Sequence, residues 1–360
     1  MNLKNGISVC LLAYKEEENL RLLLPQIKDK LAATHEAYEI IVVDTAQPLD
    51  NSRQVCDDFG CRYINQEFPG FGGAFKTGIK YAQYSKFLIM DSDGSHNPKY
   101  IPDIYNKFIG GSLDVVIGSR YVAGGKTFDA KSSIVMSKIL NGVFRIILGV
   151  RAKDISTDFR MYHTEQLKQV ERDSPLANEN YDVLQEILLK LKLQKPDKKL
   201  NIGEVPITFE KRVFGESKRR LFAFIMGYAK TMFAFMFLRF PTLRNMALYG
   251  TFGVIAAGID YGVFTIMLNV AASEIASLIG NVTGFAFTYT TNTFLNFKKR
   301  DKVVPRLVSY AAIVVFGSTV STVCIALFKN YMDVYMLKAL LLVGVSIMQF
   351  CLNKFITYRR

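Results

Sequence analysis

Four long apolar stretches near the carboxyl end limit what this chain can fold into. They cover about residues 246–268, 275–297, 307–328 and 336–355. Each is close to the roughly 20 residues that an α-helix needs to cross a bilayer. Backbone groups in lipid must be satisfied within the segment, so such stretches are expected to be helical. The sequence therefore predicts a transmembrane domain of four helices over residues 245–360.

The charge of the connecting loops predicts an orientation for these helices. The loop KKRDKVVPR, between the second and third stretches, has five basic residues and one acid, and the chain ends in YRR. Basic loops remain in the cytoplasm. With four spans, the amino-terminal part is then cytoplasmic too. We expect an integral protein of a prokaryotic cell membrane, with its soluble part and its carboxyl end in the cytoplasm.

The net charge supports a membrane partner. It is +13, which suits either nucleic acid or an anionic membrane surface. The apolar tail favours the membrane and argues against nucleic acid. Residues 219–240, RRLFAFIMGYAKTMFAFMFLRF, are apolar with basic residues inside and at both ends. Because a fifth span would move the soluble part outside, we interpret residues 219–244 as interfacial amphipathic helices.

The apolar part contains an internal repeat. NTFLNFKKR begins at Asn292 and NKFITYRR begins at Asn353, and each closes a helical hairpin. This pattern predicts a duplicated unit of two parallel hairpins. A buried asparagine in a span either bonds a neighbouring helix or lines a path for a polar group. We favour the first interpretation, and the second would suit a lipid phosphate.

Residues 1–218 have the pattern of a soluble α/β domain. Apolar strand-length runs at residues 7–14, 38–44 and 86–91 alternate with amphipathic helical patterns. This alternation predicts a mostly parallel sheet covered by helices on both faces. Five scattered cysteines and three unclustered histidines argue against a zinc site or a disulfide framework.

A carboxylate pair ends one of these strands. Asp91 and Asp93 follow the apolar run FLIM, at the carboxyl end where open α/β sheets bind ligands. Two close carboxylates repel each other unless a cation lies between them. Mg²⁺ commonly uses one or two carboxylates and completes its shell with substrate phosphates. The alternative is an ordinary acidic turn after a strand.

Other segments have residue types that suit a phosphorylated ligand. Arg120 follows a strand and offers a planar fork of donors to phosphate, although such an arginine is often an ordinary ion-pair residue. Arg212, Ser217 and Lys218 lie in a basic, glycine-containing loop that could reach a diphosphate. Gly70–Gly73 suits either a close approach to a nucleotide sugar or simple turn chemistry.

Taken in order, the motifs resemble a known family. They are CLLAYKEEEN, IIVVD, GFGGAFKTGIKYA, IMDSDGSHNP, DVVIGSRYVAGG, DFRMY and GEVPITFEKRVFGESK. Together they resemble the dolichyl-phosphate mannose synthase group of family-2 glycosyltransferases, over about residues 6–218. The resemblance implies a Rossmann-like GT-A domain. It also implies inverting transfer of a sugar from GDP-mannose, or alternatively a UDP-sugar, to a polyprenyl phosphate with Mg²⁺ or Mn²⁺.

The resemblance also implies the site residues. The implied metal ligands are Asp91, Asp93 and Ser95. The implied nucleotide-sugar contacts are Tyr14, Glu16, Asp44, Ser92, Arg212 and Lys218. The implied acceptor-phosphate contacts are Ser119, Arg120, Ser137 and Ser217. Among all of these, Asp91, Asp93, Arg120 and Arg212 would take part in catalysis.

The chain departs from the family pattern in places. Lys15 replaces an asparagine, Thr45 replaces the second acid of an Asp-Asp pair, and Asp158 replaces a glycine. These changes leave the base and the sugar open. A phosphate monoester is largely dianionic at pH 7, so the acceptor needs no protein base. The membrane part resembles the GtrA-like domain, and its alternative role is to translocate or carry the lipid-linked sugar.

Overall fold

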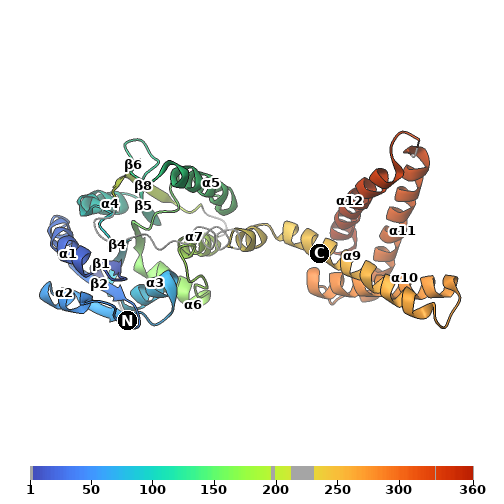
Figure 1. Ribbon diagram of the computed structural model, residues 1–360, viewed down its shortest axis with the longest axis horizontal. Helices are drawn as coiled ribbons and strands as arrows, with labels where there is room; N and C mark the ends of the chain where they lie inside the picture. Colours follow the sequence, from blue (N-terminus) through green and yellow to red (C-terminus); the bar gives the residue numbers. More distant parts are fainter. Residues whose placement is uncertain (1–2, 196–198, 212–230, 329, 360) are drawn as a thin grey trace. The chain divides into compact units, whose positions relative to one another are not determined.

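The computed structural model describes residues 3–195, 199–211, 231–328 and 330–359 of the chain. The chain forms two compact units, Met1–Arg239 and Phe240–Arg360 (Figure 1). The predicted interfacial segment begins in residues outside the described part. Residues 231–239 are helical and belong to the first unit.

The described part of the first unit contains a sheet of seven strands in the order β3-β2-β1-β4-β7-β5-β8. Only β7 runs antiparallel to its neighbours within this described sheet. The mostly parallel sheet predicted from the sequence is therefore confirmed. The strands are β1 (Lys4–Leu12), β2 (Tyr38–Asp44), β3 (Arg62–Asn65), β4 (Tyr84–Asp91), β5 (Val115–Ser119), β7 (Arg160–His163) and β8 (Ile202–Pro206).

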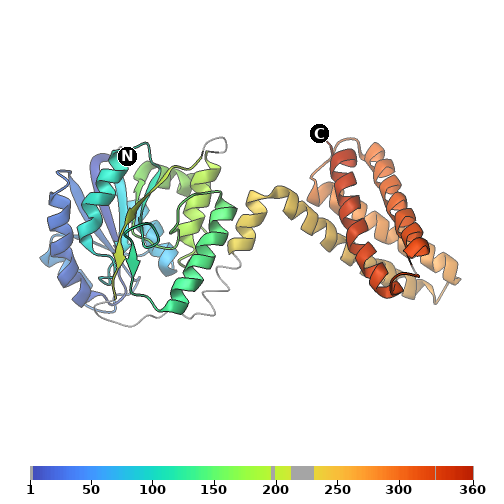
Figure 2. The ribbon, with the colours of Figure 1, turned by 90° about the horizontal axis from the view of Figure 1, so that it is seen from above.

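Helices cover both faces of this sheet (Figure 2). Successive strand residues point to opposite faces, so Ile89 joins one apolar cluster while Leu88 and Met90 join the other. A strand buried on both faces is apolar without interruption, which is the pattern that the sequence has. One face packs against α1 (Glu17–Ala32), α2 (Ser52–Asp58) and α4 (Ile101–Ile109), and the other against α3 (Gly70–Tyr81), α5 (Lys131–Leu148), α6 (Thr164–Asp173) and α7 (Val183–Leu193).

The glycines at the start of α3 allow a close approach between two backbone segments. The Gly72 amide donates to the Glu179 carbonyl at 2.8 Å. A Cβ atom on Gly72 would lie 1.9 Å from the Asn178 carbonyl oxygen. Gly70 has φ +75°, which other residues rarely adopt. In this structure these glycines accommodate the 178–179 segment.

The second unit contains four described α-helices. They are α9 (Pro241–Met267), α10 (Ser273–Thr290), α11 (Val303–Phe328) and α12 (Val334–Leu352). Short π-helical segments, η2 (Thr291–Asn296) and η3 (Asn353–Thr357), follow α10 and α12. Among the described residues, three segments are long and apolar enough to cross a membrane: Pro241–Met267, Val303–Phe328 and Leu340–Thr357. The predicted second span coincides with α10, which is not one of these three, so the count of four remains a prediction.

The internal repeat is visible in the contacts between its halves. The Asn353 side-chain amide donates to the Tyr249 hydroxyl at 3.1 Å, and the Asn292 amide donates to the Tyr310 hydroxyl at 3.5 Å. Each tyrosine therefore contacts the asparagine of the other repeat. Asn292 and Asn353 are both buried. These contacts support the interpretation of the asparagines as links between helices.

Candidate functional site

The carboxylate pair lies in a tight loop directly after β4. The Ser95 hydroxyl lies 2.5 Å from Asp93 Oδ1 and 3.3 Å from Asp91 Oδ2. The Ser95 amide also donates to Asp93 Oδ1, at 2.9 Å. The Ser92 hydroxyl donates to the Leu12 carbonyl at the end of β1, at 2.6 Å. The loop thus brings together the three predicted metal ligands, and Ser92 ties it to the neighbouring strand.

A third carboxylate, from Asp158, lies beside this loop. Carboxylate oxygens of Asp91 and Asp158 and a ring nitrogen of His96 all lie within 4.8 Å of one another. The sequence shows that Asp158 replaces the family's glycine. It does not show that Asp158 lies near Asp91, because that proximity depends on the pairing of β7 with β4.

His96 supports the loop as a neutral side chain. Its Nδ1 accepts a hydrogen bond from the Asp91 amide at 3.0 Å, and its Nε2 lies 3.3 Å from the Thr157 hydroxyl. The imidazole also stacks on Phe159. Complete burial lowers the pKa of His96. Because Nδ1 already accepts a bond, the carboxylates are the better ligands here for a hard cation.

The electrostatics of Asp91 suit a cation. Burial and the nearby Asp158 carboxylate raise the pKa of Asp91 well above its usual range. The Asp91 side chain remains 21% exposed, so an ion can reach it. A divalent cation would stabilise both carboxylates in their charged form. The oxygen donors of this group therefore suit Mg²⁺ or Mn²⁺.

Arg120, at the end of β5, is held by a buried carboxylate. Its Nε lies 2.8 Å from Asp154 Oδ2, and its Nη2 lies 3.0 Å from Asp154 Oδ1. Nη2 also donates to the Ser156 hydroxyl at 2.7 Å, and Ser156 lies 2.9 Å from the Ser137 hydroxyl. The structure therefore brings Arg120 and Ser137 together through Ser156. The remaining Nη1 lies 3.4 Å from Asp129, which is one-third exposed.

A short second sheet links Arg120 to the carboxylate loop. It pairs β6 (Lys126–Thr127) with β9 (Thr208–Phe209). The Phe209 ring lies 5.3 Å from the Arg120 guanidinium and 5.2 Å from the His96 ring. The Glu210 amide donates to the Ser95 carbonyl at 2.9 Å. Residues 209 and 210 thus contact both the carboxylate loop and Arg120 of the predicted acceptor site.

Three of the predicted nucleotide contacts, Tyr14, Glu16 and Asp44, lie at or just after the carboxyl ends of β1 and β2. Tyr14 is 47% exposed, while Asp44 is buried. The Asp44 carboxylate accepts from the Tyr63 hydroxyl and the Thr45 amide, both at 2.7 Å. Glu16 accepts from the Asn19 amide at 2.6 Å.

Ser119, a predicted acceptor contact, is buried at the end of β5. Arg212, Ser217 and Lys218 lie outside the described residues.

Lys15 adopts a backbone conformation that suits the asparagine it replaces. Its φ is 59°, in the left-handed region that asparagine tolerates better than lysine. We expect Lys15→Asn to raise the free energy of unfolding by about 0.5–1 kcal/mol. Thermal unfolding of the full chain in detergent, followed by circular dichroism, measures this.

The control for this prediction is Lys30→Asn, which places the same change inside α1. Asparagine is a poorer helix former than lysine, so this variant should give no gain. An equal gain in both variants would contradict the role of the φ angle at Lys15.

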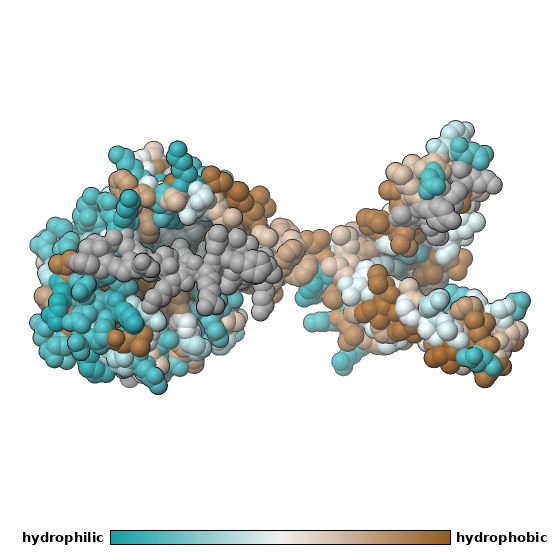
Figure 3. Space-filling view, in the orientation of Figure 1, coloured by the Kyte–Doolittle hydropathy of each residue, from teal (hydrophilic) through white to brown (hydrophobic). Residues whose placement is uncertain are grey.

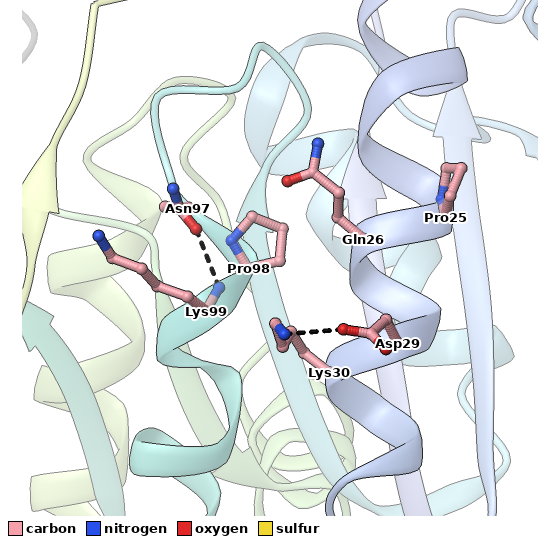
Figure 4. A pocket seen from close by; sticks show the side chains of 7 residues that line it. All are labelled: Pro25, Gln26, Asp29, Lys30, Asn97, Pro98 and Lys99. Atoms are coloured by element: carbon pink, nitrogen blue, oxygen red, sulfur yellow. Dashed lines mark hydrogen bonds and ion pairs between the residues drawn. The ribbon is translucent and has the colours of Figure 1, made fainter.

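A surface depression of about 390 Å³ lies between α1 and the segment after the carboxylate loop (Figure 4). The Asn97 side chain accepts from the Lys99 amide at 3.0 Å and thereby begins the η1 turn (Pro98–Tyr100). None of the predicted site residues lines this depression, and we assign it no role. Its lining residues are Pro25, Gln26, Asp29, Lys30, Asn97, Pro98 and Lys99.

Comparison with known proteins identifies both parts of the chain. Residues 8–170 match the model of glycosyl transferase family 2, and residues 248–358 match the GtrA/DPMS transmembrane domain. A dolichol-phosphate mannosyltransferase of Pyrococcus furiosus is 32% identical over 224 residues, which are 59% of this chain and 58% of that protein. An undecaprenyl-phosphate mannosyltransferase of Micrococcus luteus is 29% identical over 214 residues, covering 57% of this chain and 84% of the relative.

The chain thus spans less than two thirds of the first of these relatives. A solved structure, glucosyl-3-phosphoglycerate synthase from Mycobacterium tuberculosis with Mn²⁺, UDP and its product, is 18% identical. It covers 65% of this chain and 80% of its own, with a TM-score of 0.48. The two domain matches confirm a family-2 glycosyltransferase domain and a GtrA-like membrane domain, as the motifs indicated. The chain therefore contains an α/β domain of glycosyl transferase family 2, followed by a GtrA/DPMS transmembrane domain.

Proposed function

We propose that this chain transfers a mannosyl group from GDP-mannose to a polyprenyl phosphate at the cytoplasmic face of the membrane. One observation carries the proposal: the Phe209 ring contacts both Arg120, which follows β5, and His96, which binds the backbone of Asp91 in the carboxylate loop after β4. The carboxylates would hold a metal ion for the diphosphate of the donor, and Arg120 would bind the phosphate of the acceptor. The names of the two relatives, a dolichol-phosphate and an undecaprenyl-phosphate mannosyltransferase, support mannose as the sugar and a polyprenyl phosphate as the acceptor. A UDP-sugar is the alternative donor.

The donor diphosphate would bind at the carboxylate group. Asp91, Asp93 and Asp158 offer hard oxygen ligands, and Ser95 lies between the first two. A divalent cation held there would neutralise charge on the departing nucleoside diphosphate. Within the protein, His96 fixes the backbone of Asp91. Arg212 and Lys218 are proposed to bind the same phosphates.

The acceptor phosphate would bind at Arg120, with Ser119, Ser137 and Ser217 as further contacts. A phosphate dianion is already deprotonated at neutral pH, so no general base is required. Its oxygen forms a bond to the anomeric carbon while the bond from that carbon to the diphosphate oxygen breaks. A single displacement of this kind inverts the configuration at the anomeric carbon. The nucleoside diphosphate leaves with the bonding electrons.

The test uses the full-length chain in membranes. Labelled GDP- and UDP-sugars are incubated with undecaprenyl phosphate and either Mg²⁺ or Mn²⁺, and label is measured in the lipid fraction. GDP-mannose is expected to give the highest transfer, and chelation of the metal is expected to abolish it. Absence of lipid-linked label with every donor would overturn the proposed function.

Asp129 is expected to compete with the acceptor phosphate. Its carboxylate occupies the last open edge of the Arg120 guanidinium, 3.4 Å from Nη1. We expect Asp129→Asn to lower the KM for undecaprenyl phosphate by about threefold, because a partly exposed ion pair of this kind is weak. Initial rates at varied acceptor concentration measure this. Asp57→Asn removes an exposed acid from α2 and serves as the control; an equal KM in both variants would contradict the competition.

A further inference from the structure

Glu204 is a carboxylate on a side of β8 that faces an apolar cluster, whereas the visible surface of the first unit is largely hydrophilic (Figure 3). Val205 joins the cluster on one face of the sheet, and Ile202 packs against the cluster on the other face. Successive strand residues alternate between faces, so Glu204 shares the face of Ile202. Its register partner, Ile117, is fully buried in that cluster. A carboxylate in this position is unfavourable unless it is hydrogen-bonded.

The partners of Glu204 are two consecutive backbone amides. Its Oε2 accepts from the Lys153 amide at 2.9 Å, and its Oε1 accepts from the Asp154 amide at 3.1 Å. Residues 151–159 belong to no helix or strand, so regular structure supplies no partners for these amides. Both oxygens of one carboxylate thus fix the backbone at Asp154.

Asp154 in turn holds the arginine of the proposed acceptor site. It is fully buried and accepts three hydrogen bonds from Arg120: from the backbone amide at 3.0 Å, from Nε at 2.8 Å and from Nη2 at 3.0 Å. Such a pairing fixes the direction of the guanidinium as well as its position. A shift of the Asp154 backbone would therefore turn the guanidinium away from the direction that it now has.

Other side chains hold the far half of this loop. The Ile155 amide donates to the Asn141 side chain at 3.1 Å. The Ile155 carbonyl accepts from Gln185 at 2.7 Å and from Arg160 at 2.8 Å. The segment that leads on to Asp158 and the carboxylate group is therefore supported independently of β8.

We infer that Glu204 is a positioning residue for the acceptor phosphate. Through Asp154 it sets the direction in which Arg120 presents its guanidinium, without itself touching either substrate. The inference rests on the proposed function, in which Arg120 binds that phosphate. Loss of the Glu204 carboxylate should weaken acceptor binding and leave donor and metal binding unchanged.

Glu204→Gln tests this role, with Asp114→Asn as the matched control. Glutamine replaces one carboxylate oxygen by an NH₂ group, which cannot accept a hydrogen bond. Asp114 is also a buried carboxylate that accepts a backbone amide, from Asn201 at 3.0 Å, but it precedes the amino end of β5, away from Arg120. In the full-length chain in membranes, Glu204→Gln should raise the KM for undecaprenyl phosphate about tenfold. The KM for GDP-mannose should not change, and Asp114→Asn should change neither KM.

Hydrogen exchange provides a second measurement, which needs no sugar transfer. Peptides that cover residues 151–156 should exchange faster in Glu204→Gln than in the unmodified chain, while Mn²⁺ binding stays the same. Glu204→Asp keeps the charge but is one methylene shorter, so it cannot reach both amides. It should raise the acceptor KM about threefold, and it serves as the test if Glu204→Gln fails to fold.

An equal acceptor KM in Glu204→Gln and Asp114→Asn would overturn the inference. Mn²⁺ binding that weakens together with acceptor binding would also overturn it, because a general collapse of the loop would affect both. Absence of transfer by the unmodified chain would instead count against the proposed function. The exchange measurement would still show whether Glu204 holds this loop.

Discussion

Asp93→Asn is expected to lower the rate of sugar transfer by about 10²–10³-fold, the usual cost of losing one group that stabilises charge in a transition state. The substitution keeps the size of the side chain but removes its negative charge. Asp93 is buried, and its Oδ1 already accepts two hydrogen bonds from Ser95. The loop should therefore keep its shape while its affinity for a divalent cation falls. Initial rates with labelled GDP-mannose and undecaprenyl phosphate measure the loss.

Metal binding provides the second measurement for this prediction. Titration of Mn²⁺, followed by the electron paramagnetic resonance of the free ion, should show weaker binding in Asp93→Asn than in the Asp57→Asn control. Asp158→Asn should also weaken Mn²⁺ binding, by about tenfold, if the third carboxylate acts with Asp91. Transfer at the control rate in Asp93→Asn would mean that the pair after β4 is only an acidic turn.

The sheet and its carboxylate-bearing edge could be predicted because they depend on local pattern. The run FLIM before Asp91 is apolar without interruption, since β4 is buried on both faces. The carboxyl ends of parallel strands meet at one edge, so residues after β1, β4 and β5 could be grouped from the sequence alone. The length and apolar character of the stretches in the tail likewise predicted helices where α9 and α11 lie.

What could not be predicted depends on long-range pairing of short segments. β7 has four residues and β9 has two, too few for a period to be recognised. The antiparallel register pairs Ile89 of β4 with Arg160 of β7. Asp91 lies two residues after Ile89 and Asp158 lies two residues before Arg160, so this register brings the two carboxylates together.

The membrane part has one predicted span that the structure does not confirm. The helix α10 contains several threonines and an asparagine, and these polar residues lower its hydropathy. It is therefore not among the described segments that are long and apolar enough to cross a membrane.

Arg160→Leu is expected to lower the free energy of unfolding of the first unit by about 3–5 kcal/mol, the usual cost of breaking a buried charged network. Arg160 is fully buried and begins β7. Its Nε donates to the Thr157 carbonyl at 2.6 Å, and its Nη2 donates to the Ile155 carbonyl at 2.8 Å. Its Nη1 donates to the Leu184 carbonyl at 3.1 Å. Leucine fills part of the volume but leaves these carbonyls with fewer donors.

The same bonds shape the loop that carries Asp154 and Asp158, so the loss of stability should be accompanied by a loss of function. Thermal unfolding of the full chain in detergent should show a transition lowered by on the order of 10 °C. Arg172→Leu is the control, because Arg172 lies on the surface of α6 in an exposed pair with Glu165 and should change stability by less than about 0.5 kcal/mol. Arg160→Lys keeps the charge but lacks the planar fork, so it should recover only part of the stability. Recovery to the control value by lysine would show that charge alone, and not the three-carbonyl geometry, holds this loop beside Asp91.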